Sequence, residues 1–139
     1  MNRISGPLLD RIDLQIEVTP VAFDELNQKI LSESSDNIRT RVTKTREIQR
    51  LRYHQKESIH TNAQMGSGDV SAYCGLQEDT IKLLKEAMKR LGLSARAYNR
   101  ILKVARTIAD MEQSENIRTE HVSEAIQYRT LDRLNWTIN

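Results

Sequence analysis

The chain has 139 residues, 21 of them basic and 19 acidic, and its net charge of +2 neither favours nor excludes a polyanionic partner. One cysteine, Cys74, excludes an internal disulfide and a site built from several thiolates. The apolar runs are too short to cross a membrane. We therefore expect a cytoplasmic protein with no membrane partner and enough length to bury one hydrophobic core.

The first twenty residues differ in pattern from the rest of the chain. Residues 13–18, DLQIEV, alternate polar and apolar side chains as a half-buried strand does, and a short helical turn carrying Arg11 precedes them. A lone strand cannot satisfy its backbone groups, and everything after Phe23 is typical of helix. We therefore expect residues 1–20 to be the remnant of an α/β core and residues 21–139 to form a helical domain.

Two helices are expected in the next part of the chain. A short one follows Asp24 as far as Leu31, and a longer, weakly amphipathic one covers 36–56. The segment from Ile38 to Lys56 has seven basic residues against one acidic residue. Candidate DNA contacts on this helix are Arg39, Arg41, Lys44, Arg46 and Arg50. A solvated charged face is the simpler interpretation.

After a predicted loop over 56–68 and a helical turn capped by Asp69, three helices are expected. The first covers 79–91 and ends at Gly92, whose lack of a Cβ suits a left-handed helix end. The second starts after its cap Ser94 and runs to Met111, and the third follows Thr119 as far as Arg129. Helical spacing in the second places four polar residues on the side opposite its apolar face: Arg96, Lys103, Arg106 and Asp110.

Residue patterns for catalysis or metal binding are missing from the sequence. It has no phosphate-binding loop of the G-x-x-x-x-G-K-[ST] type, and Gly66-Ser67-Gly68 is expected to be a flexible loop. The histidines His54, His60 and His121 lie on three segments without the spacing of metal ligands. We expect no metal site and no catalytic activity in this chain alone.

Arg96 and Arg11 are the candidate functional residues. Arg96 lies in the first turn of a helix that begins at Ser94 and Ala95, where free N–H groups and a partial positive charge favour an anion. A guanidinium added there can bind two phosphate oxygens at once. A solvated arginine is the alternative. Arg11 is either a local ion-pair partner of Asp10 and Asp13 or an arginine that reaches the γ-phosphate of a neighbouring subunit.

Two motifs resemble those of a known family. Residues 5–14, SGPLLDRIDL, and residues 93–110, LSARAYNRILKVARTIAD, resemble segments of the magnesium-chelatase-like AAA+ ATPases of the ComM/YifB group, and residues 121–129 extend the match. The resemblance covers nearly the whole chain and implies a mainly α fold, the C-terminal helical lid bundle of an AAA+ protein. It implies that a short helix and the last strand of the missing ATPase core precede this bundle.

The resemblance also implies roles for the two arginines. Arg11 matches the arginine finger that acts in trans, and Arg96 matches the sensor-2 arginine that contacts the γ-phosphate. ATP and Mg²⁺ would bind the full-length protein, whose phosphate loop and magnesium-binding acids lie upstream, and neither is expected in this fragment. The implied assembly is a homo-hexamer that remodels DNA, by helicase action or branch migration during natural transformation.

Two alternatives to a DNA motor are left open. The first is chelatase-like remodelling of a protein partner, which is the rival function within the same fold. A stand-alone DNA-binding module would use residues 79–111 as a helix-turn-helix, with Arg96, Asn99, Arg100 and Lys103 on the recognition helix. Salt-dependent duplex binding by the chain alone would favour the module.

Overall fold

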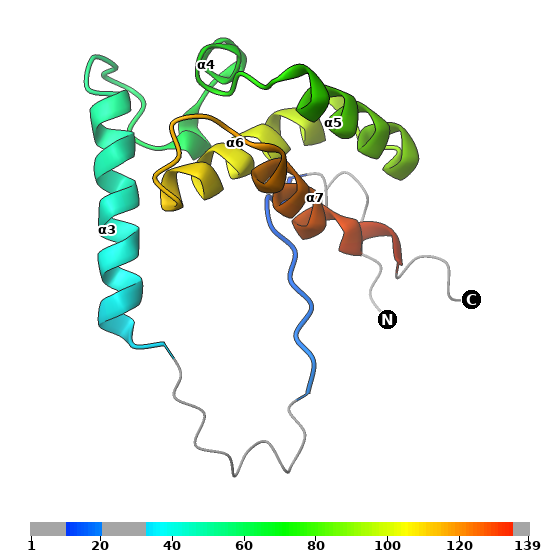
Figure 1. The fold of residues 1–139 in the computed structure, drawn as a ribbon, viewed down its shortest axis with the longest axis horizontal. Helices are drawn as coiled ribbons and strands as arrows, with labels where there is room; N and C mark the ends of the chain where they lie inside the picture. The colour runs from blue at the N-terminus through cyan, green and yellow to red at the C-terminus, as the bar shows by residue number, and fades with distance from the viewer. Residues whose placement is uncertain (1–10, 21–32, 135–139) are drawn as a thin grey trace.

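The computed structural model describes residues 11–20 and 33–134, the last five of these by their backbone alone (Figure 1). Its elements are α3 (Ser35–Arg52), a 3₁₀ turn η1 (Asn62–Gln64), α4 (Ser67–Tyr73), α5 (Glu78–Leu91), α6 (Ala95–Met111) and α7 (Thr119–Leu134). All regular structure in these residues is helical, which confirms the mainly α fold. The helix expected after Asp24 lies outside the described residues.

Helix α6 is the centre of the packing. It contacts α3, η1, α4 and α7, while α5 packs on α7. Its buried face carries small and branched apolar side chains at helical spacing, namely Ala97, Ile101, Leu102, Ala105 and Ala109. Figure 1 shows α3 upright at one side of the other helices, and much of α3 faces solvent.

The turn between α5 and α6 has the predicted capping residues. Gly92 adopts the left-handed conformation, with φ 53° and ψ 42°, and the N–H of Leu93 donates to the carbonyl of Met88 at 2.9 Å. The Ser94 hydroxyl then accepts from the N–H of Ala97 at 3.2 Å. These two caps fix where α6 begins, and thus where Arg96 stands.

Residues 13–18 form no strand in the described part of the chain. The segment 11–20 is irregular, and two backbone groups tie it to α7. The N–H of Gln15 donates to the carbonyl of Tyr128 at 2.9 Å, and Arg129 Nη1 donates to the carbonyl of Ile12 at 2.8 Å. A strand needs a neighbouring strand to complete its ladder, and none is described here. The division of the chain at residue 20 stays a prediction.

The loop expected over 56–68 is more ordered than the sequence indicates. Ile59, Asn62 and Met65 are buried in it. Gly66 to Gly68 is not a flexible loop, because α4 begins at Ser67 and the Gly66 N–H donates to Asp69 Oδ2 at 3.0 Å. The helix therefore begins before Asp69, which was expected to be its cap; Gly66 is the N-cap, and the Asp69 carboxylate accepts from its N–H from within the first turn.

Candidate anion site on helix α6

Three cationic side chains share one face at the start of α6. Arg96, Arg100 and Lys103 are spaced by four and three residues, which places them on adjacent turns. Together with Asn99 they line a hollow of about 390 Å³. The segment from Ala63 to Val70 forms another wall, and Asp13 is the one acidic side chain among the described residues of the lining.

The three cations differ in what they contact. Arg100 Nη1 forms an ion pair with Asp13 Oδ1, and Lys103 Nζ donates to the carbonyl of Ala63 at 3.0 Å. Arg96 is exposed and has no hydrogen bond or ion pair with the described residues. The described residues of the lining therefore carry two positive charges in excess, and the exposed guanidinium of Arg96 is available to an anion.

The other predicted site residues do not line this hollow. Ser94 and Ala95 form the N-terminus of α6, where the first backbone N–H groups have no intrahelical acceptor. Arg11 is exposed on the segment that leads to Asp13. Its proposed contact with a neighbouring subunit stays a prediction.

The basic residues of α3 are not gathered at the hollow. Three of the five candidates pair with acids on or beside the same helix: Arg39 with Asp36 at 3.6 Å, Arg41 with Glu33 at 2.7 Å, and Arg50 with Glu47 at 2.7 Å. Lys44 and Arg46 are exposed. This arrangement is a partly neutralised solvent face, and DNA binding by α3 stays untested.

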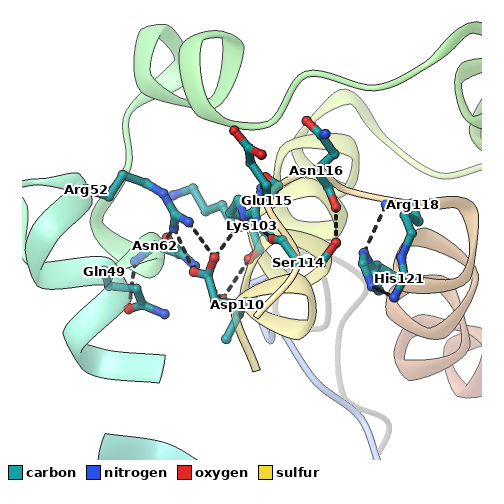
Figure 2. Close-up of polar contacts among 12 residues, drawn as sticks. Gln49, Arg52, Asn62, Lys103, Asp110, Ser114, Glu115, Asn116, Arg118 and His121 are labelled. Carbon is teal, nitrogen blue, oxygen red and sulfur yellow. Dashed lines mark hydrogen bonds and ion pairs between the residues drawn. The ribbon is translucent and has the colours of Figure 1, made fainter. Parts of the chain in front are cut away.

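Arg106 and Asp110, which the helical spacing places opposite the apolar face, do not face solvent. They are 3% and 1% exposed, because α3 and the 3₁₀ turn cover that side of α6. The carboxylate of Asp110 accepts hydrogen bonds from Arg52 at 2.7 Å, from Arg106 Nε at 3.0 Å and from Asn62 Nδ2 at 2.8 Å (Figure 2). The other Arg106 nitrogens donate to the carbonyls of Ser114 and Glu115. This polar cluster joins α3, η1, α6 and the α6–α7 loop.

Tyr53, which ends α3, completes the cluster. It is 2% exposed, and its hydroxyl donates to Asn62 Oδ1 at 2.7 Å. Burial raises the pKa of Tyr53 to about 12, although the neighbouring Arg52 guanidinium opposes the shift. The folded state therefore favours the neutral phenol.

We expect the stability of the fold to fall in strongly alkaline solution. Because the folded pKa of Tyr53 exceeds its unfolded value of about 10, its contribution is complete below pH 10 and is lost as the pH rises through about 12. The steepest loss from this group is about 1.4 kcal/mol per pH unit. Urea unfolding between pH 9 and 12 measures it. Tyr53→Phe should flatten the decline, whereas Tyr98→Phe, at an exposed ring, should not; an unchanged decline in Tyr53→Phe would contradict the assignment.

His121 has a structural role in the described residues. Its side chain is fully buried, and Nδ1 accepts from the N–H of Arg118 at 2.9 Å. The remaining ring nitrogen, Nε2, therefore carries the proton and donates to Glu112 Oε2 at 3.0 Å. This hydrogen bond lowers the pKa of Glu112. The imidazole thus ties the start of α7 to the end of α6.

The described residues were compared with the requirements of a metal site, a reactive thiol and a membrane-spanning helix. No group of three or more His, Cys, Asp or Glu side chains among residues 11–20 and 33–129 could hold a metal ion. Burial raises the pKa of Cys74 to about 11, which leaves it a poor nucleophile. None of the helices in the described part of the chain is both long and apolar enough to cross a membrane.

The sequence of the chain is similar to those of known proteins. Residues 32–129 match the family described as magnesium chelatase, subunit ChlI C-terminal. Over 135 residues the chain is 42% identical to the competence protein ComM of Haemophilus influenzae and 40% identical to the YifB proteins of Salmonella typhimurium and Escherichia coli. These alignments cover 96% of this chain and 26% of each relative, so the chain spans about a quarter of their length.

Proposed function

The chain belongs to the magnesium chelatase subunit ChlI C-terminal family, and on that premise we propose that it is the nucleotide-sensing lid of a magnesium-chelatase-like AAA+ ATPase. The observation that carries the proposal is Arg96, which stands exposed and unpaired among the described residues at the capped start of α6. Arg100 and Lys103 line the same hollow and add positive charge. Such a surface suits the terminal phosphate of a nucleotide.

In this proposal Arg96 ties the position of the lid to the presence of a γ-phosphate. The planar guanidinium takes two phosphate oxygens and helps to disperse the charge that develops during hydrolysis. Loss of the γ-phosphate removes this contact, so the lid is free to rotate and to move its neighbour in a ring. Mg²⁺ would neutralise phosphate charge in the full-length protein, held by acids beyond the described residues, which contain no cluster suited to it.

Arg11 supplies the second cation in this proposal, and it acts across a subunit interface. A finger arginine stabilises the charge on the phosphoryl group held by the neighbouring subunit. Arg11 is exposed, which supports such a contact. The assembly that fits this role is a homo-hexameric ring.

Mixed rings test the action of Arg11 in trans. Full-length Arg11→Ala subunits are expected to be nearly inactive alone, and to regain ATP turnover when mixed with subunits that keep Arg11 but lack a working phosphate loop. Each partner then supplies the half-site that the other has lost. Steady-state ATPase activity across mixing ratios is the measurement, with each variant alone as the control. Absence of recovery at every ratio would contradict the proposal.

The proposed substrate of the ring is DNA, and the relative named competence protein ComM supports this choice. Remodelling of a protein partner is the rival within the same fold. The ion pairs that Arg39, Arg41 and Arg50 make with neighbouring acids weigh only against additional phosphate contacts from α3 in a stand-alone DNA-binding module. Duplex binding that requires nucleotide-loaded full-length rings would support the motor.

A further inference from the structure

We propose that Asp13 occupies a second phosphate subsite on α6, and that Arg100 exchanges this carboxylate for a nucleotide phosphate when ATP binds. The inference rests on the proposed function, because it adds Arg100 to the phosphate contacts made by Arg96. It also gives the segment that follows Arg11 a part in the response to nucleotide.

The spacing on α6 places Arg100 next to Arg96 in the same hollow. Four residues correspond to a rise of about 6 Å along the helix, so the two guanidinium groups come from successive turns of one face. Both side chains line the same hollow of about 390 Å³, together with Lys103. A group of phosphates that reaches Arg96 from the helix start would therefore meet Arg100 next.

Asp13 is an internal anion at this surface. It lies 87 positions before Arg100 in the sequence, yet its carboxylate forms an ion pair with that guanidinium. The hydrogen bonds to the Ile12 carbonyl and from the Gln15 N–H hold the main chain on both sides of it. The carboxylate can therefore leave Arg100 by a side-chain rotation, without release of the segment from α7.

Charge and exposure favour the exchange. The side chains of Asp13 and Arg100 are 51% and 25% exposed, so water competes for both and the ion pair is weak. A phosphate carries more charge than a carboxylate and forms a stronger bidentate pair with arginine. Removing the Asp13 charge should therefore make ATP bind more tightly, because the nucleotide no longer competes with an internal anion.

The test compares ATP affinity and turnover in full-length variants. Asp13→Asn is expected to lower the KM for ATP and the Kd of a non-hydrolysable ATP analogue by about two- to fivefold, with kcat little changed. Arg100→Ala should weaken binding by about tenfold. In the Arg100→Ala background Asp13→Asn should have no further effect, since the competition then no longer exists.

Glu47→Gln is the matched control, because it removes an exposed ion pair on α3, away from the hollow. It should change neither constant, and thermal unfolding checks that every variant is folded. If Arg100→Ala does not fold, Arg100→Lys replaces it, with a smaller loss of affinity expected.

Unchanged or weaker ATP binding by Asp13→Asn would overturn the inference even if Arg96 proves essential. Wild-type turnover in Arg96→Ala would instead overturn the proposed function.

Discussion

Replacing Arg96 with alanine in the full-length protein is expected to lower ATP turnover by about 10²- to 10³-fold while the fold is kept. The rate loss corresponds to removal of one preorganised donor to a phosphoryl group in the transition state. The fold should persist because Arg96 is exposed and lies outside the core, where substitutions change stability by about 0.5 kcal/mol or less. Alanine also favours the helix.

Steady-state ATPase assays and thermal unfolding of the same preparations measure the two parts of this prediction. Arg90→Ala is the matched control, because Arg90 is an exposed arginine near the end of α5 that does not line the hollow. Arg90→Ala should keep wild-type turnover. Arg96→Lys should recover only part of the activity, since an ammonium group cannot bind two oxygens in one plane. Turnover by Arg96→Ala at the wild-type rate would refute the role of this side chain.

Local sequence signals predicted the elements that position Arg96. Gly92 predicts a helix end and Ser94 a helix start, because each caps the backbone groups of residues next to it in the sequence. The structure has both caps where expected. The apolar spacing of α6 likewise predicted its buried face. These features depend on neighbours in the sequence, so a single chain is enough to find them.

The same local signals could not predict contacts between segments that lie far apart in the sequence. The helical period separates the faces of α6, but it does not reveal that α3 covers the polar one and buries Arg106 and Asp110. α3 itself turns the polar residues Thr45 and Gln49 inward, which is why its pattern is only weakly amphipathic. The Arg106 and Asp110 pair, four residues apart, was the available signal of an ion pair, yet nothing nearby in the sequence pointed to Arg52.

Asp110→Ala is expected to destabilise the chain by about 3–5 kcal/mol, more than any surface substitution. It would leave Arg106, whose side chain is 4% exposed, and Arg52, whose side chain is 15% exposed, without their shared counter-charge. It would also remove an acceptor from Asn62. Because these partners come from α3, η1 and α6, the loss should loosen the attachment of α3 to the rest of the bundle.

Urea unfolding of the 139-residue chain at neutral pH measures this loss, with Asp79→Asn as the control at an exposed ion pair. The control should stay within about 0.5 kcal/mol of wild type. Asp110→Asn retains one oxygen acceptor but not the charge, so its cost should lie between the two. A loss below about 1 kcal/mol in Asp110→Ala would mean that water reaches the guanidinium groups and that the cluster does not fasten α3 to α6.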